Sequence, residues 1–343
     1  MVIKSKDYNS KMSNKVKPLI VTTEEAGQRL DKWIKFHFSN ISKIMVEKLC
    51  RTGQIRVDSA RVKPNIKLFE NQLIRIPNFI RYNNKKIDKV FTNRDTDLFN
   101  KLKEAIVYED DYFLIFNKPF GLAVQGGSKL GNVHLDGILP LFSKNKFSPP
   151  KLVHRLDKET SGILVVAKTS KSASEFSKLM VNRKILKSYW ALVTSPPKNK
   201  SGILYNPSSD TFLLKKDLIE KYGLDKEFIK AKLFTLNSEN KETVSTYKEI
   251  KVQDNFSWLK LWAITGRKHQ LRKQLAYIGC SIIGDDKYGQ KEKILRNNKK
   301  EKLQLHAREI IFKNPITDKL IKVKCSPPDH MKEFLNTSKI NKF

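Results

Sequence analysis

Cysteine is scarce in this chain of 343 residues, which contains only Cys50, Cys280 and Cys325. The three are odd in number and far apart, and their spacing does not match a metal-binding motif. We therefore expect ordinary buried or half-buried thiols, with neither a structural disulfide nor a bound metal.

Long hydrophobic runs are also missing from the sequence. No apolar stretch approaches the roughly 20 residues that a membrane-spanning helix needs. Residues 1–17 are polar and rich in lysine, without the apolar core of a secretory signal, and they contain no arginine, which disfavours a transit peptide. We expect a flexible basic arm at 1–17 on a cytoplasmic protein that does not bind membranes.

Acidic residues are few relative to basic ones. Lysine and arginine number 67 against 35 aspartates and glutamates, which gives a formal net charge of +32. This excess is far larger than solubility requires, and its natural partner is a polyanion such as nucleic acid. A bias in composition would produce the same excess. An acidic membrane surface is a second alternative, although no strongly amphipathic basic helix supports it.

The length suggests about two domains, and residues 18–76 are predicted to form the first. Apolar residues at helical spacing predict one helix, and a serine N-cap with a glycine stop predicts another. Two short β-rich runs predict a small sheet. The residues concerned are Leu30, Trp33, Ile34 and Phe38 for the first helix, Ser42 to Arg51 and Gly53 for the second, and 55–57 and 73–76 for the strands.

This module resembles the αL-type RNA-binding domain first known from a ribosomal protein. The matching segments are 27–31, Ser42-Lys43 and 53–57. The resemblance implies that a basic face binds phosphates. The implied contact residues are Arg29, Lys32, Lys43 and Arg51. A helical cap on the next domain is the alternative reading of the same pattern.

The rest of the chain is predicted to be a linker and a second domain. Residues 77–104 are polar, lack sustained periodicity and predict a linker. Residues 105–335 mix short β-rich runs with helical stretches at 171–182 and 269–278. This mixture predicts an α+β domain with a mainly antiparallel mixed sheet. The charged segment 207–240 is expected to be a surface excursion, and 336–343 a tail.

The loop 154–161 is a candidate site of catalytic residues. It leads into a continuous apolar run at 163–166, which is typical of a buried strand. Asp157 would then lie at the mouth of a core element, where a carboxylate needs a charge partner or hydrogen bonds. Gly162 allows a tight return into the strand. A structural turn stabilised by the aspartate fits the same pattern.

Two further segments contain candidate functional residues within a predicted helix and a predicted strand. A helix starting near Lys268 would place His269 and Arg272 on one face, where a guanidinium can meet a carboxylate or a phosphate. A solvated basic face is the alternative. In Lys187-Ser188-Tyr189, the tyrosine begins an apolar strand. Taken alone, such an aromatic is most often a core residue.

The succession of these motifs resembles the RluA-type family of pseudouridine synthases. The resemblance extends from about residue 20 to residue 335, nearly the whole chain. In order, the segments are Glu109 to Gly121, His154 to Gly162, Lys187-Ser188-Tyr189, Thr265 to Arg272, Gly284 to Gly289 and Leu305-His306-Ala307. Several separate motifs in the family's order make a chance match very improbable.

The resemblance implies an isomerase that needs no cofactor and that detaches uracil from the ribose, turns it and rejoins it through carbon. Asp157 is implied as the catalytic carboxylate, which suits a glycosidic bond that leaves an electron-poor sugar. Tyr189 is implied to stack on the base and serve proton transfer, and Arg272 to form the ion pair with Asp157. Arg155 would fill the gap left by an extruded uridine. The implied substrate-binding residues are His154, Arg155, Leu156, Arg267, His269 and Gln270.

Within the family, the segment 123–127 and the N-terminal module are most similar to the C-type members, which act on several uridines of 23S rRNA. The D-type members are the nearest alternative. The expected partner is large-subunit rRNA, free or in a pre-ribosomal particle, and the expected state is a monomer. From other classes, a non-catalytic RNA-binding assembly factor would share the charge and the module. A nucleoside hydrolase would need a second well-placed acid to deliver water, and the sequence shows none.

Overall fold

The computed structural model describes residues 18–23, 25–38, 41–82, 92–126, 133–143, 149–208, 211–214, 243–253, 256–289, 295–296 and 299–337. The chain divides into two compact units, Met1–Val90 and Phe91–Phe343. The division falls inside the range expected to be a linker. The basic arm expected at 1–17, most of the excursion expected at 207–240 and most of the tail expected at 336–343 lie outside the described residues.

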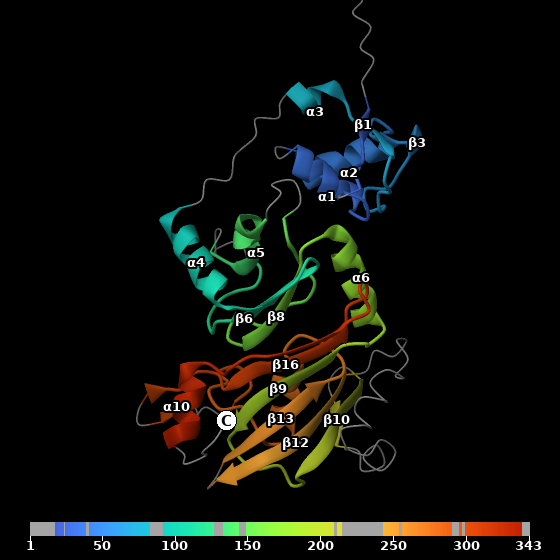
Figure 1. The fold of residues 1–343 in the computed structure, drawn as a ribbon. Helices are drawn as coiled ribbons and strands as arrows, with labels where there is room; N and C mark the ends of the chain where they lie inside the picture. Colours follow the sequence, from blue (N-terminus) through green and yellow to red (C-terminus); the bar gives the residue numbers. More distant parts are fainter. Residues whose placement is uncertain are drawn as a thin grey trace, which may run out of the picture. The chain divides into compact units, whose positions relative to one another are not determined.

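The described part of the first unit contains three helices and a small antiparallel sheet (Figure 1). Both predicted helices are present, and Ser42 caps the second by accepting a hydrogen bond from the Met45 amide. Gly53 follows this helix at a φ of +71°, in the left-handed region that glycine adopts without strain. The helices are α1 (Leu30–His37), α2 (Lys43–Arg51) and α3 (Asn78–Tyr82), and the strands in sheet order are β1 (Leu19–Ile20), β4 (Leu73–Arg75), β2 (Arg56–Val57) and β3 (Ala60–Arg61).

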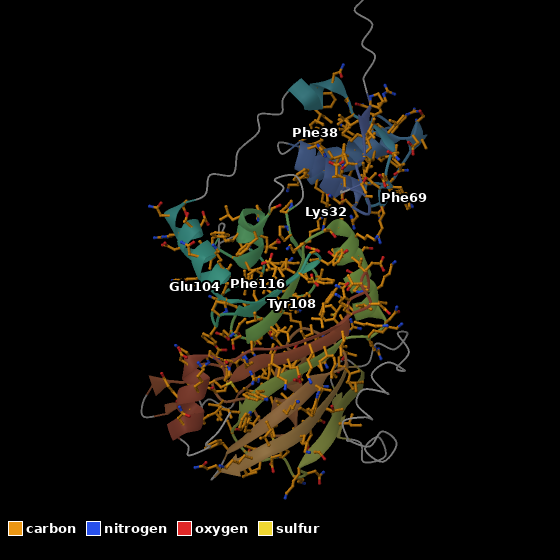
Figure 2. All side chains as sticks on the ribbon, in the orientation of Figure 1. Lys32, Phe38, Phe69, Glu104, Tyr108 and Phe116 are labelled. Carbon is orange, nitrogen blue, oxygen red and sulfur yellow. The ribbon has the colours of Figure 1, made fainter. Side chains whose placement is uncertain are left out.

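The core of the first unit is made by the apolar faces of the two helices. Trp33 and Ile34 of α1 pack with Leu49 of α2 and Ile74 of β4 in one buried cluster. Lys32, on another face of α1, is exposed (Figure 2). Burying the apolar face therefore turns the basic side chains toward solvent.

The second unit is built on one large mixed sheet, so the predicted α+β architecture is confirmed. Among the described strands of this sheet, every pairing is antiparallel except that of β16 with β8. In sheet order the strands are β11 (Thr211–Leu214), β10 (Ser201–Ser208), β12 (Thr243–Gln253), β13 (Phe256–Ala263), β9 (Leu186–Val193), β16 (Leu305–Lys313), β8 (Ser161–Ala167), β6 (Phe113–Lys118) and β5 (Ile106–Glu109). The strands β17 (Leu320–Lys324) and β7 (Lys151–Leu152) add to β16 and β8, and β14 (Leu295–Arg296) pairs with β15 (Lys299–Lys300).

Helices cover parts of this sheet, and one of them corrects the predicted linker at 77–104. Helix α4 occupies residues 93–104 of this range, and the short α3 lies at its start. Helix α4 begins with a capping box between Thr92 and Asp95, and Leu102 is buried in the same apolar cluster as Phe116, which Figure 2 labels. The charged composition of α4 hides this short apolar face, so its helical periodicity is weak in the sequence. The helices are α4 (Asn93–Glu104), α5 (Leu135–Ile138), the 3-10 turn η1 (Leu139–Phe142), α6 (Ser170–Val181), α9 (Gln270–Tyr277) and α10 (Asp329–Thr337).

Two large buried apolar clusters make up most of the described core of the second unit, and smaller ones lie beside them. The first gathers around β6, β8 and α6, and includes Phe113, Val165 and Phe176. The second gathers around β12, β13 and α9, and includes Leu261 and Leu275. Tyr189 on β9 packs against both clusters. This strand therefore lies at the seam of the core, where its side chains can serve both halves.

Gly162 allows the two strands at this seam to approach closely. It has a φ of +106° and pairs with Ala307 in the parallel β8–β16 ladder. A Cβ atom at this position would lie 2.2 Å from the carbonyl oxygen and 2.7 Å from the amide nitrogen of Ala307. Because both atoms belong to a central strand, no side chain can be accommodated without moving that strand.

We expect Gly162→Ala to destabilise the second unit severely, since it adds a backbone clash to the strain of positive φ. Gly279→Ala is the matched control, because Gly279 has a φ of +76° with nothing within 4 Å of its Cβ position. The control should lower the free energy of unfolding by only about 1–2 kcal/mol, the usual left-handed strain. Chemical denaturation measures both variants, and equal losses would contradict the close approach.

Candidate active site

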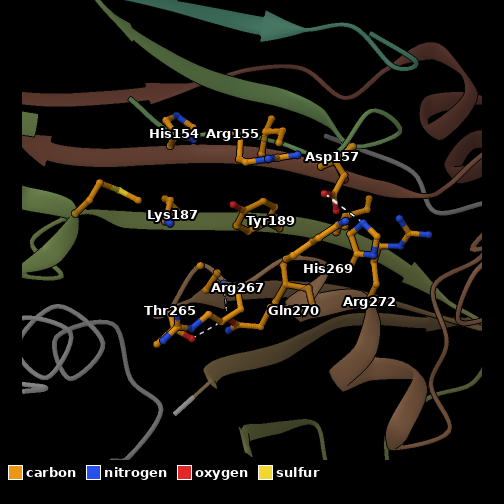
Figure 3. Close-up of a pocket in the computed structure, with 18 of the residues that line it drawn as sticks. His154, Arg155, Asp157, Lys187, Tyr189, Thr265, Arg267, His269, Gln270 and Arg272 are labelled. Carbon is orange, nitrogen blue, oxygen red and sulfur yellow. Dashed lines mark hydrogen bonds and ion pairs between the residues drawn. The ribbon is translucent and has the colours of Figure 1, made fainter. Parts of the chain in front are cut away.

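Three segments that are distant in the sequence meet at one cavity of about 310 Å³ (Figure 3). They are the loop between β7 and β8, the first half of β9, and the loop that leads from β13 into α9. The structure thus brings together every catalytic and substrate-binding residue implied by the family resemblance. These lining residues are His154, Arg155, Leu156, Asp157, Tyr189, Arg267, His269, Gln270 and Arg272.

The carboxylate of Asp157 faces the ring of His269. The Asp157 side chain is 22% exposed, and its Oδ1 lies 3.5 Å from Nε2 of His269. Burial lowers the pKa of His269, although the negative charge of Asp157 opposes the shift, so the ring is neutral at neutral pH. Nδ1 lies 2.9 Å from the hydroxyl of Tyr288. If Nδ1 accepts this hydroxyl proton, Nε2–H is directed at Asp157.

The backbone of His269 departs from the sequence prediction. His269 has a left-handed conformation, with φ 54° and ψ 26°, and α9 begins only at Gln270. The prediction that His269 and Arg272 share one helical face is therefore wrong. Non-glycine residues with positive φ are uncommon and are found at functional sites when surrounding contacts hold them in place.

Gln270 supplies those contacts. Its side-chain oxygen accepts hydrogen bonds from the Thr265 hydroxyl at 2.7 Å and the Arg267 amide at 3.0 Å. Its side-chain nitrogen donates to the Val244 carbonyl at 3.0 Å and to Ser245 Oγ at 2.7 Å. These four bonds use the full capacity of the amide. Gln270 thus lines the cavity and fixes the loop around it, and its predicted contact with substrate stays a prediction.

Arg272 is paired with Asp285, which corrects the expectation that it pairs with Asp157. Its guanidinium binds both carboxylate oxygens of Asp285, with Nε–Oδ2 at 2.8 Å and Nη2–Oδ1 at 2.6 Å. The side chains are only 4% and 1% exposed. Asp285, rather than Asp157, binds Arg272 because its two carboxylate oxygens match the planar guanidinium. The backbone amides of Lys287 and Tyr288 donate hydrogen bonds to Asp285 and hold its carboxylate in place. Arg272 still lines the cavity, and the charge of Asp157 acts on it at longer range.

We expect Asp285→Ala to lower the free energy of unfolding by about 3–5 kcal/mol, because it leaves the Arg272 charge buried without a partner. Asp286→Ala is the matched control. Asp286 lies 3.7 Å from the same guanidinium but is 43% exposed, so its loss should cost less than about 1 kcal/mol. Urea denaturation at neutral pH measures the difference. Comparable losses in the two variants would show that Asp285 is not the principal partner.

Tyr189 presents a protonated phenol to the cavity. Burial, together with the nearby negative charge of Asp157, raises the pKa of Tyr189 to about 12. The hydroxyl therefore keeps its proton at any physiological pH, as the unperturbed value of about 10 already suggests. Tyr189 can stack on a base and donate a proton, and it can accept one only if its own proton is passed on.

His154 anchors the loop that carries Asp157. Its Nε2 accepts a hydrogen bond of 2.8 Å from the Val165 amide. Burial, with a smaller contribution from the charge of Lys187, lowers the pKa of His154 to about 3. The ring is therefore a neutral hydrogen-bond acceptor that attaches the loop to β8. Leu156 combines two roles, because it lines the cavity and is also buried in the first apolar cluster.

Lys118 anchors the same loop from inside the protein, and the sequence analysis did not single it out. It is fully buried, and its Nζ donates to the carbonyl oxygens of Pro119, Leu122 and Lys158 at 3.0, 2.9 and 3.1 Å. Burial lowers its pKa to about 7, although the charge of Asp157 opposes the shift. The signal in the sequence was a lysine before proline at the end of an apolar strand.

The first unit carries a basic groove of about 520 Å³. Arg29, Lys43 and Arg51, three of the four predicted RNA contacts, line it together with Lys63, which the sequence analysis missed. Lys32 does not line the groove. Asp31 and Glu47 pair with Arg29 and Lys43 at 2.7 and 3.8 Å and leave their cations largely exposed. The groove therefore offers hydrated cations to an anionic ligand.

The cysteines are free and buried, as predicted. Within the described residues no group of three or more histidine, cysteine, aspartate or glutamate side chains is arranged to hold a metal ion. No helix in the described part of the chain is long and apolar enough to cross a membrane.

Comparison with known proteins places this geometry among RNA-modifying enzymes. Residues 112–277 match the family model described as RNA pseudouridylate synthase. The ribosomal large subunit pseudouridine synthase C of Rickettsia typhi is 32% identical over 304 residues, covering 88% of this chain and 94% of the relative. The protein of the same name from Yersinia pestis is 29% identical over 328 residues, covering 95% and 97%.

A solved structure supports the fold. The human protein named RNA Pseudouridylate Synthase Domain Containing 4 matches with a TM-score of 0.54 and 24% sequence identity. The match covers 72% of this chain and 97% of the human chain. The segment that matches the family model contains the loop of Asp157, the strand of Tyr189 and the loop of His269, which line the cavity.

Proposed function

Because this chain belongs to the RNA pseudouridylate synthase family, we propose that it isomerises uridines of large-subunit ribosomal RNA to pseudouridine, with Asp157 as the catalytic carboxylate. One observation carries the assignment of the residue. Asp157 lies in the cavity with only a neutral histidine within 4.0 Å as a charge partner, whereas Asp285 is fully engaged by Arg272. A carboxylate whose oxygens are not used by a cation is available to react.

The reaction begins with extrusion of the uridine, because a stacked nucleotide hides the bond between sugar and base. Arg155 is exposed at the mouth of the cavity and suits the space that the departed base leaves in the RNA. Tyr189 offers its ring as a stacking surface for the uracil. The nucleotide thus enters with its base against Tyr189 and its ribose toward Asp157.

Two steps are open to Asp157 once the ribose is in place. As a nucleophile its carboxylate attacks C1′ while the bond to N1 breaks. As a base it removes a proton from C2′, and the C–H electron pair forms a C1′–C2′ double bond while N1 leaves with the electrons of its bond to C1′. Either step creates positive character at the sugar that a carboxylate stabilises. The ring of His269, 3.5 Å from Oδ1 of Asp157, orients the carboxylate. The product has the same atoms as the substrate, so no redox partner enters the balance.

The similarity to relatives named pseudouridine synthase C supports large-subunit rRNA as the substrate. We further propose that this chain modifies the uridines that C-type members of the family select, rather than those that D-type members select. Mapping pseudouridine in rRNA from cells that lack the gene identifies the sites directly. A cytoplasmic location and a monomeric state stay predictions from the sequence.

We expect Asp157→Asn to abolish isomerisation, by at least about 10⁴-fold, while RNA affinity stays within a few fold, because the amide keeps the shape but neither attacks nor removes a proton. Single-turnover assays on a large-subunit rRNA fragment measure the rate, and filter binding measures the affinity. Turnover by the variant would overturn the role of Asp157. Binding without turnover by the unaltered protein would instead indicate a non-catalytic assembly factor.

We also propose that the basic groove of the first unit binds RNA phosphates. The double variant Lys43→Gln/Arg51→Gln should bind rRNA more weakly and with a salt dependence reduced by about 0.7 per lost phosphate contact. Lys35→Gln is the control, because Lys35 is exposed on α1 but does not line the groove. Affinity measured across a series of salt concentrations tests this, and an unchanged slope in the double variant contradicts the proposal.

A further inference from the structure

Four cationic side chains that line the cavity differ from Arg272, because they have no side-chain hydrogen bond or ion pair to any residue that the structure describes. They are Arg155, Lys187, Arg267 and Lys268. Three of them, Arg155, Arg267 and Lys268, are exposed. Lys187 differs because it is half-buried. A desolvated ammonium without an acceptor is costly, and such groups gather at sites where a ligand supplies the partner.

Lys187 lies at the end of the cavity away from Asp157. In the view of Figure 3, the ring of Tyr189 lies between Lys187 and the contact of Asp157 with His269. Lys187 and Tyr189 are two residues apart on β9, so their side chains point to the same side of the sheet. A Cβ atom on Gly266 would lie 3.5 Å from the Lys187 Nζ, so the ammonium is close to the backbone of the loop before α9.

The ammonium of Lys187 keeps its proton under ordinary conditions. Burial lowers its pKa to about 8, so the charged form predominates at pH 7. The neighbouring His154 ring is neutral and bonded to the Val165 amide, so it does not neutralise this charge. Besides Arg272, which Asp285 neutralises, the cavity thus holds the partly desolvated cation of Lys187 on the other side of Tyr189 from Asp157.

We propose that Lys187 is a further catalytic residue, whose ammonium donates a hydrogen bond to a carbonyl oxygen of the uracil stacked on Tyr189. This rests on the proposed function, which places a uridine in the cavity. With the ribose at Asp157 and the base against Tyr189, the far edge of the uracil reaches toward Lys187. The exposed cations at the mouth are better placed for the phosphates, which remain hydrated.

The chemistry explains why a cation belongs at that edge. Heterolysis of the C1′–N1 bond leaves its electron pair on the uracil ring, whose two carbonyl oxygens share the negative charge. After the ring turns, an electron pair of the ring forms the C1′–C5 bond, the C5 hydrogen leaves as a proton and N1 takes up a proton. A donor directed at a carbonyl oxygen stabilises the detached ring more than the neutral uridine, so it accelerates the reaction rather than only tightening binding.

The test compares Lys187→Met with Lys184→Met, an exposed lysine that does not line the cavity. In single-turnover assays on an rRNA fragment, Lys187→Met should be slower by about 10²-fold, the usual cost of losing one such donor. Its RNA affinity and melting temperature should match those of the control. Lys187→Arg should recover part of the rate, because it restores a cationic donor.

Sulfur substitution then locates the contact. Sulfur is a weaker hydrogen-bond acceptor than oxygen. The target uridine is therefore replaced by 2-thiouridine or by 4-thiouridine, and the rates of the unaltered protein and of Lys187→Met are compared on each RNA. The difference between the two rates should become smaller only when the sulfur replaces the carbonyl oxygen that Lys187 contacts. A rate for Lys187→Met within about threefold of the unaltered protein overturns the proposal. So does a loss confined to RNA affinity, or a rate difference that neither thio-uridine changes. Absence of turnover by the unaltered protein on the same RNA would count against the proposed function instead.

Discussion

The close approach of β8 to β16 at Gly162 is the constraint on which the active-site geometry depends. Without a side chain at this position, the only parallel pair among the described strands of the large sheet can form, with Ser161 opposite His306 and Gly162 opposite Ala307. The hydroxyl of Ser161 and Nδ1 of His306 are 2.9 Å apart, which fixes the start of β8. The loop of Asp157 ends at this point, so its position follows from backbone packing in the core.

The loop is then held from both sides by polar groups that do not react. Lys118 binds the carbonyl of Lys158 from within the core, and His154 accepts a hydrogen bond from β8. Gln270 holds the opposite loop, in which His269 has its left-handed conformation. Buried groups whose bonding capacity is filled make the site rigid, and this rigidity fixes the position of the Asp157 carboxylate in the cavity.

The charges around the cavity divide into paired and unpaired sets. Asp285 satisfies Arg272, so the strongest buried ion pair is structural, and Asp157 keeps its oxygens for chemistry. The cations at the mouth face solvent and suit an RNA backbone, whereas Lys187 is partly desolvated. Burial thus distinguishes side chains of the same charge, because Lys187 is partly desolvated whereas the other three cations are hydrated.

The sequence by itself determined the α+β class, the helices of the first unit and the motifs that line the cavity, because periodicity, caps and loop residues are local properties. It also indicated Asp157, although the loop alone fitted a structural turn as well, and the resemblance to the RluA-type family implied the catalytic role. Only the tertiary structure decided that Arg272 pairs with Asp285, that Gln270 is saturated and that α4 is a helix. These outcomes depend on which groups meet across the fold, and the competition between Asp157 and Asp285 for one guanidinium is settled by bidentate geometry and burial, which no local pattern records.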